Sequence, residues 1–281
     1  MSSQDLTPSP PAGHEAESAT PGERIDRRLP KLSPPSRSLT LRSLLRADFV
    51  SQARNARALL GTLVLPVVYV VLLSTGKRAV ALGGPKFGVA SSLVGGMGLI
   101  AVAGYSLTLA RHRELGVFQR LRVAPVSTWE IMASRLIVQV AAMLGMAIIV
   151  LAVAVIGFSV HLSAGAWLLT LAMVVVGGAE FLSIGQAIVG LIRSSETVRA
   201  VAPVVFIPLF VLSIFAHLAK FGSTLEIVSR WSPGGVVATI LVAAMQPGTW
   251  TLSTWGALAT TVGYAAVFAG IGIRWFKWTS Q

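Results

Sequence analysis

The chain has 281 residues, of which 54% are hydrophobic and only 12% charged, whereas an average soluble domain has about 25% charged residues. This composition excludes an ordinary water-soluble domain, and several apolar stretches reach the roughly 20 residues that cross a bilayer as a helix. The formal charge of +12 does not indicate a nucleic-acid partner, because the basic residues lie at the ends of apolar stretches rather than on one polar face.

The first 57 residues predict two different segments before the apolar stretches begin. Residues 1–38 are rich in Pro, Ser, Glu and Arg, so we expect a disordered cytosolic tail. They contain no apolar core of a signal peptide, and we expect insertion without cleavage of the N-terminus. Residues 39–57 place leucines and Phe49 on one helical side, with arginines beside them and Asp48 as an exception on the apolar side. This pattern favours an amphipathic helix lying in the membrane interface, with a solvated cytosolic helix as the alternative.

Residues 58–281 are predicted to form one transmembrane domain of six spans. The spans are expected at residues 58–75, 89–110, 131–158, 164–192, 198–216 and 252–273. Most of the 23 Lys and Arg residues then fall on the side of the two termini. The positive-inside rule therefore predicts a multi-pass plasma-membrane protein with both termini in the cytoplasm.

A further apolar stretch, at residues 236–245, is too short to cross a bilayer. A short amphipathic stretch at 224–230 precedes it, and the turn between them contains Ser232, Pro233 and Gly234. Serine followed by proline is a favourable N-cap and first helical position. We therefore expect a re-entrant helix before the last span.

The sequence gives no sign of a catalytic or metal site. It lacks a phosphate-binding P-loop, a zinc-binding H-E-x-x-H pattern and a G-x-S-x-G nucleophile turn. The chain has no cysteine, and its four histidines are dispersed over the expected tail, one cytosolic loop and the outer surface. We therefore expect a non-catalytic protein that binds no cofactor or metal itself.

The loop between the second and third predicted spans is the most informative segment. Basic and acidic residues alternate there with apolar ones, which is typical of a short helix that docks into a groove of another protein. The positive-inside rule alone would explain the arginines but not the apolar residues between them. The residues predicted to dock are Arg111, Arg113, Glu114, Gly116, Phe118, Leu121 and Pro125.

This loop resembles the family of ABC-2 type permeases, whose loop reads approximately R-E-x-G-x-x-x-x-L-x-x-x-P. Arg113, Glu114, Gly116, Leu121 and Pro125 match this pattern, although Phe118 and Gln119 stand where the family often has a Leu-Glu pair. Prolines in the first and fifth spans and the turn W-S-P-G before the last span are also similar to the family.

The resemblance implies the membrane subunit of an ATP-binding-cassette exporter. Its partners would be two copies of a separate ATPase, which binds ATP and Mg²⁺, and a second permease subunit, identical or similar. The resemblance also assigns the ATPase-coupling role to the loop, and it implies export, for example of a drug, a lipid or a glycan. The low number of aromatic residues argues against a sugar-stacking path and slightly favours an amphiphilic cargo.

Polar residues inside the predicted spans offer a second hypothesis. Glu180 lies near the middle of the fourth span, and Arg135 and Gln139 lie one turn apart on the third. We hypothesise that these three residues, with Gln186, form an interhelical polar cluster. It would either stabilise the contact between the helices or serve as a substrate or proton site.

Three other functions stay open at this stage. One is a proton-coupled secondary transporter that uses Glu180, against which the absence of an internal repeat counts. The others are a membrane scaffold and an intramembrane enzyme acting on lipid, which would need a clustered nucleophile and base that the sequence does not offer.

Overall fold

The computed structural model describes residues 37–54, 56–75, 84–116, 128–158, 160–216 and 223–275. Every regular element in these ranges is a helix, which confirms the predicted all-α fold. The expected tail lies outside the described residues up to Ser36, and so does most of the loop between the second and third spans.

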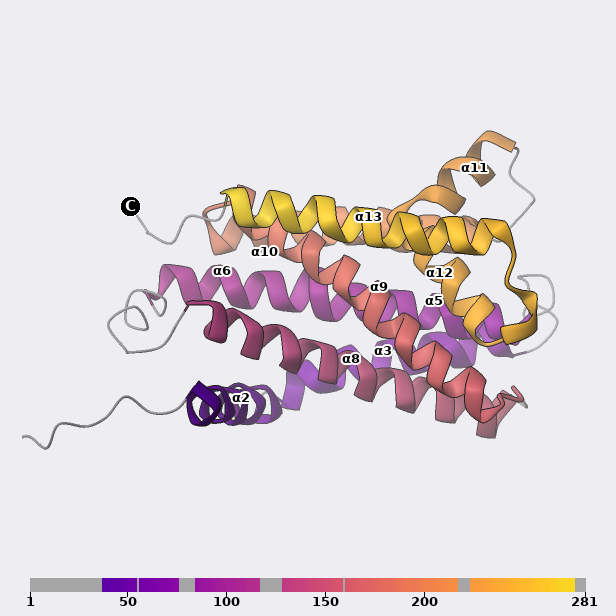
Figure 1. The fold of residues 1–281 in the computed structure, drawn as a ribbon, viewed down its shortest axis with the longest axis horizontal. Coiled ribbons are helices and arrows are strands. Elements are labelled where there is room, and N and C mark those ends of the chain that lie inside the picture. The colour runs from indigo at the N-terminus through magenta and orange to yellow at the C-terminus, as the bar shows by residue number, and fades with distance from the viewer. Residues whose placement is uncertain are drawn as a thin grey trace, which may run out of the picture. The chain divides into compact units, whose positions relative to one another are not determined.

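The helices follow the predicted order, with ends that differ by a few residues from the predicted ones (Figure 1). The second span consists of three continuous helical pieces, of which the middle one is a π-helix. The elements are α2 (Arg37–Arg54), α3 (Ala56–Ser74), α5 (Pro85–Gly98), the π-helix η1 (Leu99–Tyr105), α6 (Ser106–Glu114), α8 (Thr128–Phe158), α9 (Ala164–Leu191), α10 (Ser195–Phe215) and α13 (Leu252–Trp275).

Among the described residues, five helices are long and apolar enough to cross a bilayer by themselves. They are the second span (Pro85–Glu114), α8, α9, α10 and α13. Helix α3 has 19 residues, about 28 Å at 1.5 Å per residue, but its apolar part Gly61–Ser74 is shorter than the others. The chain is therefore a multi-pass membrane protein.

The second span forms the middle of the bundle. Within its apolar window 83% of the residues are buried, compared with 17% in α10 and α13. Glycines allow this close packing, because the phenyl ring of Phe206 from α10 fills the space beside Gly98, and the thioether of Met146 from α8 fills the space beside Gly96. Burial of this kind leaves the outer faces of α10 and α13 to contact lipid or another subunit.

Helix α9 connects the second span to α13 through glycines on two of its faces. A Cβ added to Gly185 would lie 2.6 Å from the carbonyl oxygen of Ala101 in η1. A Cβ added to Gly190 would lie 3.1 Å from the carbonyl oxygen of Gly272 in α13. These positions accept no larger side chain without moving the backbone, so glycine fixes the spacing of the three helices.

Helix α2 packs on α8 through a polar contact that the sequence did not predict. Ser134 of α8 donates a hydrogen bond to Asp48 of α2, while Leu44 packs against the apolar core. Asp48 is therefore an anchor rather than an exception to the apolar pattern. Phe49, which the helical pattern places on the apolar side, is 61% exposed.

Before the last span, α11 (Ser223–Trp231) and α12 (Pro233–Ala244) meet at an angle of 77°. The hydroxyl of Ser232 accepts a hydrogen bond from the backbone N–H of Gly235 at 3.1 Å, and Pro233 is the first helical residue, as predicted. A Cβ on Gly234 would overlap the carbonyl oxygen of Leu209, so α12 packs tightly against α10. The one-turn helix η2 (Pro247–Thr249) then leads into α13.

Candidate functional site

The candidate site lies at the end of the bundle where α6 and α9 end and α10 begins, which we call the loop end (Figure 1). Helix α6 stops there because Gly116 has a φ of 65°, a conformation that glycine adopts without strain, and its N–H donates to the carbonyl of Arg113 at 3.1 Å. Gly116 thus gives the predicted loop a defined starting point.

Arg113 binds the C-terminal end of α9. Its guanidinium donates to the backbone carbonyls of Val189 at 2.7 Å, Ile192 at 2.5 Å and Arg193 at 2.7 Å. The last carbonyls of a helix have no partner within the helix, and they carry the negative end of its dipole. The side chain is 7% exposed, so this residue of the predicted docking surface is turned into the protein.

Glu114 binds the first turn of α10. Its carboxylate accepts hydrogen bonds from the backbone N–H of Ser195 at 2.6 Å and from the Ser195 hydroxyl. A carboxylate at a helix N-terminus satisfies a free N–H and interacts favourably with the dipole. Arg113 and Glu114 therefore tie the end of α6 to the turn between α9 and α10, and we call these two residues the loop-end clamp.

The remaining residues of the predicted docking set are divided. Arg111 and Leu115 at the end of α6 are exposed, Leu115 by 69%. Phe118, Leu121 and Pro125 lie outside the described residues. The exposed residues beside the clamp are thus next to the loop in the sequence.

The residues of the hypothesised intramembrane cluster are divided between two locations. Arg135 and Gln139 of α8 line a cavity together with Tyr105 of η1 and Asp48 of α2. The Tyr105 hydroxyl donates a hydrogen bond to the side-chain oxygen of Gln186 at 2.7 Å. The carboxylate of Asp48 attracts the guanidinium of Arg135 electrostatically. Gln186 is therefore joined to this group through Tyr105, a link that sequence spacing does not reveal.

Glu180 is not part of that group. It is fully buried on α9, and Thr261 of α13 faces it. The Thr261 hydroxyl donates to the carbonyl of Ala257 at 3.0 Å, and neither carboxylate oxygen has a hydrogen-bond partner among the described residues. An interhelical contact between Glu180 and Arg135 is not formed, because the two side chains belong to different packing interfaces.

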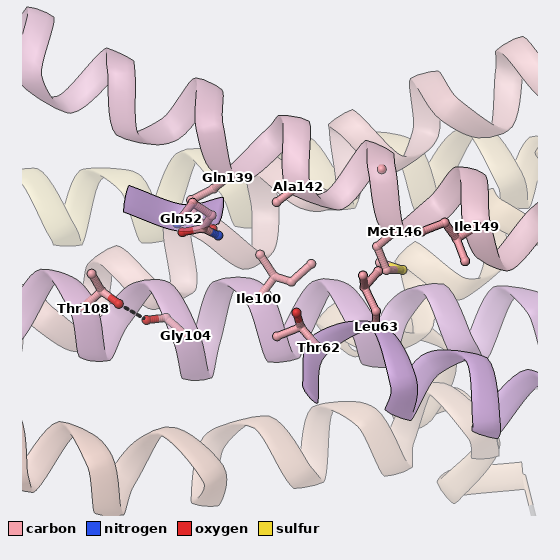
Figure 2. Close-up of a pocket in the computed structure, with 11 residues that line it drawn as sticks. Gln52, Thr62, Leu63, Ile100, Gly104, Thr108, Gln139, Ala142, Met146 and Ile149 are labelled. Atoms are coloured by element: carbon pink, nitrogen blue, oxygen red, sulfur yellow. Dashed lines mark hydrogen bonds between the residues drawn. The ribbon is translucent and has the colours of Figure 1, made fainter. Parts of the chain in front are cut away.

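Two neighbouring cavities lie between α2, the second span and α8, and α3 also lines the first of them. The first, of about 250 Å³, is lined mainly by apolar and small residues such as Leu63, Ile100, Gly145 and Met146 (Figure 2). The second, of about 320 Å³, is lined mainly by polar residues of α2, η1, α6 and α8. The π-helix η1 contributes to both, and π-helical segments are frequent at functional sites.

A comparison with protein families matches residues 40–246 to the ABC-2 type transporter model. The chain belongs to this family. A comparison with curated proteins gives no match. The family match covers α2, the clamp and the α11–α12 pair, so each of these elements belongs to the membrane domain of an ABC-2 type transporter.

In this transporter the first, second and fifth spans meet at a group of aromatic side chains. Tyr69 of α3 packs edge-on against Phe210 of α10, with ring centroids 5.1 Å apart. Phe206 stacks on Phe210 at 5.8 Å, and a Cβ on Gly95 of α5 would lie 2.8 Å from the Phe210 ring. A rotation of α10 would therefore move the contacts of all three spans.

Proposed function

We propose that this ABC-2 type transporter chain is the permease subunit of an exporter driven by a separate ATPase. Two permease subunits, identical or similar, would associate with two ATPase subunits, which bind ATP and Mg²⁺. The observation that supports the proposal is the loop-end clamp, because it ties the end of α6, from which the loop starts, to α9 and α10. A loop with that connection is suited to receive motion from a docked protein.

The mechanism follows from this connection. ATP binding closes the two ATPase subunits, and their motion displaces the loop and α2 at the cytoplasmic surface. The clamp passes the displacement from α6 to the ends of α9 and α10. Because Phe206 and Phe210 pack into the glycine surface of α5, movement of α10 changes the packing of the first, second and fifth spans. ATP supplies the differential affinity that shifts the permease between inward-open and outward-open states.

The cargo of this exporter is proposed to be an amphiphilic drug-like molecule, a lipid or a glycan. The assignment of both termini to the cytoplasm rests on the arginine and lysine distribution. The side of the loop end is then cytoplasmic, where the ATPase and ATP are found.

The experiment is co-purification of the permease with its cognate ATPase, followed by measurement of ATP hydrolysis. We expect wild type to retain the ATPase, and the double variant Glu114→Arg, Leu121→Asp to lose it. Leu121→Asp alone leaves the clamp intact and separates loss of docking from loss of folding. If intact wild-type permease retains no ATPase, the proposed function is wrong.

A matched control changes the opposite end of the bundle. Glu226→Arg with Ile227→Asp introduces the same chemical changes on α11, where Ile227 is 60% exposed. This variant should retain the ATPase, because α11 lies away from the loop end (Figure 1). Loss of the ATPase in this control as well would mean that charge changes of this kind disturb the permease generally.

A further inference from the structure

The two cavities between α2, the second span and α8 adjoin each other. Three polar residues, Gln52, Thr108 and Gln139, line both. Figure 2 shows Gln52 and Gln139 side by side, with Leu63, Met146 and Ile149 grouped away from them. A polar compartment thus adjoins an apolar one, which is the arrangement that binds the head and the chain of an amphiphile.

The polar compartment carries positive charge suited to an anionic head group. Arg111 and Arg135 both line it, and Asp48 is the acidic residue among its lining residues. The charge of Asp48 acts on Arg135, but a guanidinium has five N–H donors and can bind a phosphate oxygen as well. Arg111 at the loop end is exposed. The compartment thus offers one exposed and one half-buried arginine to an anionic group.

The apolar compartment extends away from the loop end toward the middle of the bundle. It lies between Leu63 of α3, Ile100 of η1 and the α8 residues Met146 and Ile149. Gly145 of α8 also lines it, and a Cβ at this position would have no atom within 4 Å. The space is open rather than filled by side chains, and two cavities of about 250 and 320 Å³ are together as large as ordinary ligand sites.

We propose that the two adjoining cavities together bind an anionic glycerophospholipid of the leaflet next to the loop end. The phosphate lies at Arg111 and Arg135, and one acyl chain lies between α3, η1 and α8. Position and charge favour a membrane lipid over a soluble anion, since the apolar half would stay empty with the latter. The lipid would join α2 to the bundle at the place where Asp48 already anchors it. This site goes beyond the proposed export function and does not depend on it.

The test is native mass spectrometry of the purified permease, without ATPase, titrated with dioleoyl-phosphatidylglycerol or dioleoyl-phosphatidylcholine. The two lipids have the same chains and differ in head-group charge. We expect the anionic lipid to bind about tenfold more tightly, because both lipids carry the phosphate but only phosphatidylcholine also carries a choline cation, which the two arginines repel. Inorganic phosphate at millimolar concentration should not displace it, since phosphate lacks the acyl chain.

Two pairs of variants test the two halves of the site. Arg111→Gln should remove most of the preference for phosphatidylglycerol, whereas Arg46→Gln, an exposed arginine of α2 that does not line either cavity, should not. Gly145→Leu should fill the apolar cavity and lower the affinity for both lipids about tenfold or more. Gly157→Leu, which also adds a side chain to open space on α8 but outside the cavity, should have no effect.

Three results would overturn the proposal. Equal binding of the two lipids would remove the anionic head-group site, and displacement by phosphate would mean that a soluble anion is the ligand. Unchanged binding in Gly145→Leu with a wild-type unfolding temperature would remove the acyl-chain site. Because the ATPase is absent from this experiment, its outcome is separate from that of the co-purification.

Discussion

Replacing Arg113 with alanine tests the loop-end clamp most directly. The change removes three hydrogen bonds, of 2.7, 2.5 and 2.7 Å, between a buried guanidinium and carbonyls at and just after the end of α9. A hydrogen bond to a charged group contributes about 1.5–3 kcal/mol, and bonds that share one side chain add less than fully. We therefore expect a loss of about 3 kcal/mol in the free energy of unfolding, which is less than the sum of three such bonds.

For a domain of this size, 3 kcal/mol corresponds to a decrease in Tm of about 6–12 °C. The assay is thermal unfolding of the detergent-purified permease, followed by tryptophan fluorescence. The matched control is Arg199→Ala, which removes an exposed arginine of α10 that lines neither cavity. Arg113→Lys should give an intermediate decrease, because an ammonium group lacks the planar fork that reaches several carbonyls. A Tm for Arg113→Ala within about 2 °C of that for Arg199→Ala would refute the clamp.

Three further changes have expected outcomes measurable in the same unfolding assay. Gly185→Val forces a Cβ against the carbonyl of Ala101 and should cost about 1–3 kcal/mol, whereas Gly270→Val on the open face of α13 should not destabilise by overpacking. Ser232→Ala removes the cap of α12 and should cost about 1 kcal/mol. Glu180→Gln keeps the side-chain size without a carboxylate in a fully buried position, so stability should be unchanged or higher. Loss of transport in a stable Glu180→Gln protein would instead favour the proton-coupled mechanism.

Much of the fold could be predicted because bilayer thickness limits it so strongly. A run of about 20 apolar residues has almost no other stable arrangement in a membrane than a spanning helix. The break at Ser232 and Pro233 could be predicted for a similar reason, since both residues act on the backbone next to them. Local chemistry and length therefore determine the helices and their order.

The contacts of the site could not be predicted, because they join residues far apart in sequence. Glu114 and Ser195 are 81 positions apart, and Asp48 and Ser134 are 86 positions apart. The sequence indicates that Asp48 is unusual on an apolar side, but it does not indicate which helix lies opposite. The contacts of Arg113 are still harder to predict, since its partners are backbone carbonyls, which every residue has.

Backbone partners also determine what the clamp can transmit. Side-chain partners can change rotamer and let a contact slip, whereas the carbonyl of Ile192 and the N–H of Ser195 move only with their helices. A displacement of the loop that keeps these bonds must therefore carry the end of α9 and the start of α10 together. Without the clamp, the same displacement would act on α6 and α8 alone, through the two covalent ends of the loop. With the clamp, a displacement of the loop therefore acts on four spans instead of two. One of them is α10, whose aromatic side chains contact the first and second spans.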